Sequence, residues 1–211
     1  MSEGRVAGPA PRRVRADAAR NVDALLEAAK AAFASSGVDV PMREIAGRAG
    51  VGIGTLYRHF PKRSDLIQAV FRREVDACAD AGESLAAGYE PVEALRRWLL
   101  RFTDFVATKR GLAAALHSGD PAYDALPAYF TGRLAPTLRG LLDAAAAAGE
   151  IRGDMDADEL LVAVSRLCLA GPGDDGTEQS RRMVGVLVDG LRFGGAGARA
   201  SSGPRTTDAD N

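Results

Sequence analysis

Side chains that donate hydrogen bonds or carry positive charge gather in one short stretch, between residues 43 and 63. They are Arg43, Thr55, Tyr57, Arg58, His59, Lys62 and Arg63. Gly52 and Gly54 lie among them, and a residue without a Cβ lets the backbone approach a partner closely. Donors of this kind suit nucleic acid, because phosphate oxygens accept hydrogen bonds and attract cations. The stretch therefore predicts a surface that binds a polyanion.

The charge of the chain is divided in a way that agrees with such a surface. The formal net charge is −1, yet residues 1–75 carry 13 Lys+Arg against 8 Asp+Glu, a net of +5. The remaining residues carry 14 against 20, a net of −6. This separation suggests that the N-terminal end faces the polyanion. Residues 1–15 are rich in Gly, Pro and Arg and predict a disordered basic arm, in which Arg12, Arg13 and Arg15 extend the grip on DNA.

The apolar residues around the donors indicate the helices that position them. A helix is expected over residues 17–36, where apolar residues recur every three or four positions and Gly37 follows. A second, short helix is expected over 41–49, with Pro in its first turn, and a third over 53–60. Gly50 lies where the chain turns sharply, in a conformation that is cheap only for Gly. Two short helices packed on a longer one form a helix-turn-helix.

The outward face of the third helix suits the major groove of DNA. Base reading is assigned mainly to Arg43, because Arg pairs best with guanine, with Ile53 and Arg58 as further candidates. Ile53 can contact a thymine methyl group. Phosphate contacts are assigned to the small positions at the start of this helix and to the other donors, namely Gly52, Gly54, Thr55, Tyr57, His59 and Lys62.

The string IAGRAGVGIGTLYRHFPKRSDL, residues 45–66, resembles the N-terminal domain of the TetR family of bacterial repressors. The strong match covers about residues 17–71. The resemblance implies a three-helix DNA-binding domain followed by a larger helical domain for ligand and dimerisation. It implies DNA contacts at Arg43, Ile53, Gly54, Thr55, Tyr57 and His59, and phosphate contacts at Lys62 and Arg63. Two positions depart from the family pattern, since Pro41 replaces the usual Ser or Thr cap and Ile53 replaces a residue that is often polar.

The rest of the chain also has helical periodicity and no strand pattern of useful length. Further helices are expected over residues 62–85, 92–108, 112–117, 126–148, 157–170 and 179–193. Pro136 should kink or split the longest of the later helices, because it removes a backbone donor. The expected fold class is therefore all-α, with about nine helices. The expected division is a basic arm (1–15), a DNA-binding domain (16–75), a ligand-binding and dimerisation domain (76–193) and a disordered tail (194–211).

The family resemblance implies a ligand pocket within the fifth to seventh helices and a homodimer formed through the last two. Pocket candidates are Trp98, Arg101, Phe102, Phe105, Leu116, His117 and Tyr129, for which plain core or surface roles are the alternative. Two apolar faces exceed what one helical hairpin needs to bury, which favours a partner copy. These faces comprise Leu160, Leu161, Val164, Leu167, Met183, Val184, Val186, Leu187 and Leu191.

Other chemistries find no support in the residues. The acids at 154, 156 and 158 begin like a calcium loop, but Glu159 and Ser165 fall where that loop needs Gly and Glu. Cys78 and Cys168 stand alone, which is typical of buried, reduced cysteines. We find no catalytic set, metal site or cofactor site, and expect no enzyme activity. No apolar run is long enough for a membrane span and no secretion signal is present, so we expect a cytoplasmic protein.

These observations lead to one hypothesis and one alternative. The hypothesis is a sequence-specific DNA-binding transcriptional regulator, a homodimeric repressor that a small-molecule ligand releases from a double-stranded operator. The alternative is a small-molecule-binding helical protein whose helix-turn-helix no longer reads DNA. The reason for this alternative is the start of the third helix, where Gly52, Ile53 and Gly54 offer few side-chain hydrogen bonds.

Overall fold

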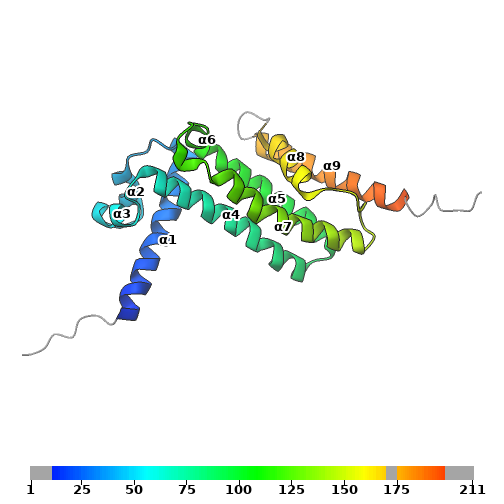
Figure 1. Ribbon diagram of the computed structural model, residues 1–211, viewed down its shortest axis with the longest axis horizontal. Helices are drawn as coiled ribbons and strands as arrows, with labels where there is room; N and C mark the ends of the chain where they lie inside the picture. The colour runs from blue at the N-terminus through cyan, green and yellow to red at the C-terminus, as the bar shows by residue number, and fades with distance from the viewer. Residues whose placement is uncertain (1–10, 170–174, 198–211) are drawn as a thin grey trace, which may run out of the picture. The chain divides into compact units, whose positions relative to one another are not determined.

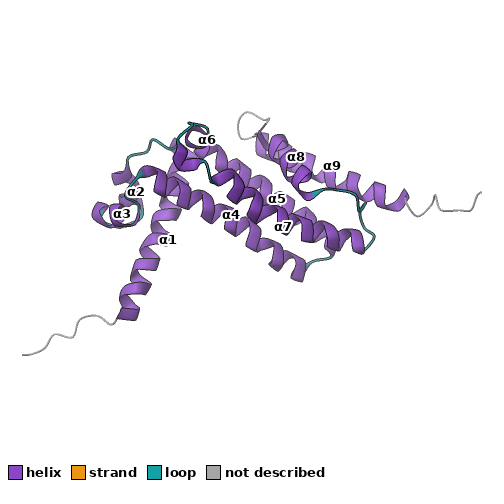
Figure 2. Cartoon of the chain, in the orientation of Figure 1, coloured by secondary structure: helices purple, strands orange, loops and turns teal. Residues whose placement is uncertain are grey.

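The computed structural model describes residues 11–169 and 175–197, and every regular element in these ranges is a helix (Figure 2). Two short 3-10 helices, η1 (Arg110–Leu112) and η2 (Pro121–Tyr123), flank α6. The α-helices, in the order of Figure 1, are α1 (Pro11–Ser36), α2 (Met42–Arg48), α3 (Ile53–His59), α4 (Arg63–Gly88), α5 (Pro91–Lys109), α6 (Ala113–Leu116), α7 (Leu126–Ala147), α8 (Ala157–Leu169) and α9 (Asp175–Gly197). The predicted all-α fold class is confirmed for the described residues.

The helix ends differ from expectation at both ends of the chain. The first helix begins at Pro11 rather than at residue 17, so residues 11–15 are helical and not a disordered arm. Pro is well tolerated at the first helical position, and the Arg and Ala residues that follow it favour helix. The last helix extends to Gly197, so residues 194–197 are helical and not tail. The remainder of the expected arm and tail lies outside the described residues.

The chain divides into two compact units. The first comprises the chain up to Phe71 together with the segment Arg110–Asp124, and the second comprises Arg72–Lys109 and the chain from Ala125 onward. The segment 110–124 therefore packs with the N-terminal helices, whereas the expected division places it in the larger domain, residues 76–193. A Cβ added to Gly111 would lie 2.4 Å from the backbone oxygen of Phe33, which places η1 directly against α1.

The core of the first unit is built by short apolar repeats on four helices. On α1, Leu25, Ala29 and Ala32 are fully buried, and their spacing of four and three residues places them on one helical face. The same core includes the buried side chains Phe33, Ile45, Leu56, Leu66 and Ile67. Gly37, at a φ of 75°, ends α1 in the left-handed conformation that favours Gly.

The second unit is centred on α5, which packs against α7, α8 and α9. Trp98 is fully buried, and its indole Nε1 donates to the backbone oxygen of Cys78 on α4 at 2.9 Å. The helix α7 continues through Pro136 from Leu126 to Ala147, so of the two expected effects of Pro136, a kink or a split, the split does not occur. Among the described helices, none is long and apolar enough to cross a membrane.

Candidate nucleic-acid interface

The turn between α2 and α3 is a hydrogen-bonded glycine cap. The N–H of Gly50 donates to the oxygen of Gly47 at 3.1 Å, and the N–H of Val51 donates to the oxygen of Ala46 at 3.0 Å. This pair of bonds is the Schellman pattern, which needs a left-handed residue just after the helix. Gly50 supplies it, with a φ of 68°. The local sequence therefore fixes where α2 ends and in which direction the chain leaves it.

Burial separates the inward and outward residues of these two helices. Met42, Ile45 and Ala46 of α2 and Leu56 of α3 are buried. Ile53 and Tyr57 of α3 are 38% and 49% exposed, so these two large side chains lie outside the core. The predicted contact residues Arg43, Gly52, Gly54 and Arg58 are exposed, and Thr55 and His59 are partly exposed. We call these eight residues the α2–α3 face.

The two glycines of this face are not required by the packing of the protein itself. A Cβ added to Gly52 or Gly54 would meet nothing within 4 Å, and neither residue has a positive φ. A glycine with open space beside it is the position at which an external backbone or phosphate can approach closely. Both glycines lie at the beginning of α3, where the first N–H groups of a helix have no acceptor one turn earlier.

Lys62 and Arg63 follow α3 and begin α4, but they lie in different environments. Lys62 is exposed, and its backbone N–H donates to the Asp65 carboxylate at 2.8 Å, which caps α4. Arg63 is half-buried, and its guanidinium Nη1 donates to the backbone oxygens of Val38 and Val40 at 2.5 and 2.6 Å. The structure therefore does not bring Arg63 together with the α2–α3 face.

The three predicted arginines of the basic arm are Arg12, Arg13 and Arg15. Their backbone lies in the first turns of α1. Their side chains lie outside the described part of the structure, so their DNA contacts stay a prediction.

Known families match both parts of the chain. Residues 25–70 match the family model of bacterial regulatory proteins of the tetR family. Residues 90–193 match the C-terminal domain of SbtR-like transcriptional regulators. A crystal structure of a TetR transcriptional regulator from Streptomyces coelicolor is 39% identical, with a TM-score of 0.71, and the alignment covers 81% of this chain and 98% of that one. The chain belongs to the TetR family.

Two further relatives agree with this membership. A TetR transcription regulatory protein from Mycobacterium vanbaalenii is 38% identical with a TM-score of 0.68, over 85% of this chain and 99% of that one. An HTH-type transcriptional regulator from Staphylococcus aureus (strain USA300) is 34% identical over 94 residues, which are 42% of this chain and 51% of that protein. The chain thus spans about half the length of this curated relative. The predicted family and the predicted class, a DNA-binding transcriptional regulator, are confirmed.

Three of the predicted pocket residues of this TetR-family chain form a closed aromatic stack. Trp98, Phe102 and Phe105 are buried. The ring centroids of Trp98 and Phe102 are 5.7 Å apart with nearly parallel planes, and those of Phe102 and Phe105 are 6.0 Å apart. Phe130 of α7 completes the cluster at 6.0 Å from both phenylalanines. These side chains serve as core of the second unit in this structure.

The other four pocket candidates do not join this stack. Arg101 is exposed and donates to the backbone oxygen of Ala77 at 3.1 Å, and Tyr129 donates to the Asp76 carboxylate at 2.7 Å. Leu116 and His117 belong to the first unit. The exposed His117 ring contacts the backbone oxygen of its own helical turn.

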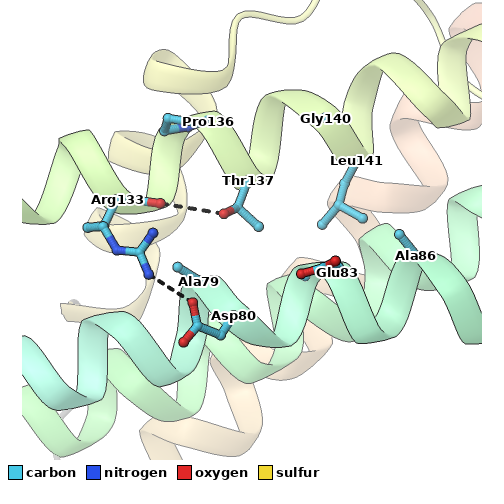
Figure 3. Close-up of a pocket in the computed structure, with 10 residues that line it drawn as sticks. Ala79, Asp80, Glu83, Ala86, Arg133, Pro136, Thr137, Gly140 and Leu141 are labelled. Carbon is cyan, nitrogen blue, oxygen red and sulfur yellow. Dashed lines mark hydrogen bonds and ion pairs between the residues drawn. The ribbon is translucent and has the colours of Figure 1, made fainter.

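The structure places two open grooves beside α4, within the second unit. One, of about 500 Å³, runs between α4 and α7 and is shown in Figure 3, where Asp80 and Glu83 face Arg133 and Thr137. Arg133 bridges to Asp80 at 2.8 Å. The other, of about 650 Å³, lies between α4 and α5 and includes Arg101. The first groove could not be predicted from the sequence, because its walls are mostly small and polar residues rather than the aromatic ones that usually suggest a pocket.

The expected dimer face is only partly exposed. Leu160, Leu161, Val164, Val184 and Leu191 are buried within the chain itself. Several large apolar side chains of α8 and α9 remain exposed, namely Val162, Leu167, Met183, Val186 and Phe193. We call these five residues the α8–α9 face. Val162 and Phe193 were not in the predicted set. Phe193 follows Val186 by seven residues, a spacing that places both on one side of α9 and could have identified it.

Proposed function

We propose that this TetR-family chain is a homodimeric repressor that binds its operator through the α2–α3 face and leaves it when a small molecule binds the second unit. The single observation that carries the proposal is the α2–α3 face itself. It combines two exposed cations, an exposed Tyr and two unobstructed glycines on a turn that glycine geometry fixes. A buried core beneath the face holds both helices in one arrangement.

The chemistry of the face supports distinct roles for its residues. The guanidinium groups of Arg43 and Arg58 can pair with the O6 and N7 atoms of guanine in the major groove. Ile53, exposed at the first position of α3, suits the methyl group of thymine. The Tyr57 hydroxyl and the Lys62 ammonium suit phosphate oxygens on the flanks of the groove.

The α8–α9 face supports the dimer. Five large apolar side chains on two neighbouring helices are costly to leave in water. A second copy presenting the same face would cover them in an isologous interface. Two copies related in this way would read half-sites about 34–36 Å apart along the duplex.

The helix α4 supports a route for ligand control. It is one unbroken helix from Arg63 to Gly88, and its second half lines both grooves of the second unit. A ligand that binds one packing arrangement of α4 better than another shifts the equilibrium between them by that difference in affinity.

The proposed protein acts by binding rather than by catalysis, and it acts in the cytoplasm.

Selection from a randomised duplex library tests the proposal. The full chain is incubated with the library at several salt concentrations, and bound duplexes are sequenced over successive rounds. We expect a two-fold symmetric motif with half-sites about 10 base pairs apart. We also expect the logarithm of the binding constant to fall linearly with the logarithm of salt concentration. Enrichment of no sequence over the starting library would contradict sequence-specific DNA binding.

A further inference from the structure

Arg63 is the first residue of α4, but its side chain forms hydrogen bonds with a loop that is distant in the sequence. Its Nη1 donates to the backbone oxygens of Val38 and Val40, at 2.5 and 2.6 Å. These carbonyls belong to the loop between α1 and α2, 25 and 23 residues earlier in the chain. The side chains of Val38 and Val40 are buried in the core on the same loop. One cation therefore holds two carbonyls of a loop whose valine side chains are anchored in the core.

The loop leads directly into α2, which has no side-chain cap of its own. Pro41 occupies the N-cap position of α2, and no side-chain hydrogen bond caps that end. A Ser, Thr, Asp or Asn at this position would satisfy one of the free N–H groups and define where the helix begins. Pro41 fixes its own φ but cannot accept such a bond. The start of α2 is thus held through the carbonyls of residues 38 and 40.

The charge of Arg63 is poorly placed for the stability of its own helix. Positive charge near a helix N-terminus opposes the helix dipole, which favours acidic residues there, such as Asp65. The contacts with the α1–α2 loop offset this cost. The guanidinium also lies near Tyr123 of η2, where burial raises the pKa of the hydroxyl and the Arg63 charge partly opposes the rise. Arg63 therefore bonds to the α1–α2 loop and acts electrostatically on Tyr123.

We infer that Arg63 is a positioning residue for DNA binding, which clamps the start of α2 to the start of α4 and does not contact phosphate. The inference rests on the proposed function, because it concerns how Arg43 on α2 is held against DNA. It also assigns a different role from the one that the family resemblance implied for Arg63. Lys62, exposed one residue earlier, keeps the phosphate contact.

Amide hydrogen exchange of the free protein tests the clamp without DNA. Arg63→Met keeps the apolar length of the side chain and removes its donors. We expect the amide of Ile45 in α2 and that of Ala49, which donates to the Ile45 oxygen, to exchange about tenfold faster than in the wild type, with α8 unchanged. Arg63→Lys, which retains a donor, should restore part of the protection. Unchanged exchange in α2 of Arg63→Met would overturn the inference, and if that variant does not fold, unchanged exchange in Arg63→Gln, which is shorter and neutral, would do so.

The salt dependence of DNA binding separates a clamp from a phosphate contact. The probe is the duplex that the wild type selects from the library. Arg63→Met should bind about tenfold more weakly or worse, with the same slope of log affinity against log salt as the wild type. Lys62→Ala is the matched control and should lower the slope by about 0.9 per chain. A lower slope in Arg63→Met, equal to that of Lys62→Ala, would overturn the inference.

The two failures are distinguishable. If the wild type selects no duplex, the proposed function is wrong, while the exchange rates of α2 still decide whether Arg63 is a clamp. If the wild type binds DNA and α2 of Arg63→Met exchanges normally, only the inference about Arg63 is wrong.

Discussion

At the scale of single residues, the α2–α3 face divides its work between reading bases and holding phosphates. Arg43 is exposed and carries a planar guanidinium, which can donate two parallel hydrogen bonds to guanine. Tyr57 is half exposed and offers one hydroxyl, which suits a single phosphate oxygen. A base contact distinguishes one sequence from another, whereas a phosphate contact strengthens binding to all of them.

Substitution of these two residues should therefore give different patterns. We expect Arg43→Ala to cost about 1–3 kcal/mol on the selected duplex and to relax the preference at one base pair. Tyr57→Phe should weaken binding to every duplex by a similar factor. Affinities for the selected duplex and its single-base variants measure both effects. An equal loss on all duplexes for Arg43→Ala would place that residue on phosphate instead.

The reactivity of the two cysteines gives a second prediction at this scale. Both are about 2% exposed, and burial raises the pKa of the Cys78 thiol from 9.0 to about 12. A thiolate is the reactive form, so we expect neither cysteine to be alkylated in the native protein at pH 8. After unfolding in guanidinium chloride, the chain should be alkylated at both cysteines, and mass spectrometry measures the number of alkyl groups added. Since the folded pKa of Cys78 is raised, its contribution to stability is lost as the pH rises above about 9.

At the scale of elements, close contact between η1 and α1 depends on Gly111. A Cβ at this position would lie 2.4 Å from the oxygen and 2.8 Å from the carbonyl carbon of Phe33, and backbone atoms cannot rotate away. The segment Arg110–Asp124 is thus held against the first unit by a contact that only Gly permits. Gly47 in α2 provides the opposite case, because a Cβ there would meet nothing within 4 Å.

Alanine substitutions at these glycines should change stability in opposite directions. Gly111→Ala should destabilise the chain by about 1–3 kcal/mol, because η1 must move away from α1. Gly47→Ala should stabilise it by about 0.5–1 kcal/mol, because Ala favours helix and has open space. Urea unfolding of the full chain measures both free energies. Equal effects of the two substitutions would contradict the packing of η1 on α1.

Local features of the sequence were sufficient to predict most of the elements. The spacing of Leu25, Ala29 and Ala32 indicates a buried helical face, and Gly50 marks the turn, because both signals depend on residues close in sequence. The role of Arg63 could not be predicted in this way, since its partners lie more than 20 residues away. The aromatic residues of α5 indicate burial but do not distinguish a core from a pocket lining. That distinction depends on Phe130, which another helix supplies.

At the scale of the whole molecule, the proposed regulator needs two copies to present two α2–α3 faces. The α8–α9 face has the apolar character expected of a homodimer interface. Val186 is 64% exposed on α9 and lies among the other members of this face by helical spacing. A charge introduced there would be buried without a partner in the dimer, which is strongly unfavourable.

Substitution of Val186 should therefore dissociate the protein without unfolding it. We expect the wild type to sediment at twice the chain mass of 22.1 kDa at micromolar concentration, and Val186→Glu at the chain mass. Ala128→Glu, at an exposed position on α7, is the matched control and should remain a dimer. If the Val186→Glu variant stays dimeric, the dimer interface does not include Val186 and the proposed α8–α9 interface is wrong.

The central claim is that the α2–α3 face recognises a particular DNA sequence, and a comparison of two duplexes tests it most directly. Affinities of the wild type and of the double variant Arg43→Ala/Tyr57→Ala are measured for the selected duplex and for a scrambled one, at about 150 mM salt. We expect the wild type to prefer the selected duplex by about 1,000-fold or more. The double variant should bind both duplexes more weakly and prefer the selected one less than the wild type does, while its helix content and dimer mass stay unchanged. Equal affinity of the wild type for both duplexes would contradict the claim.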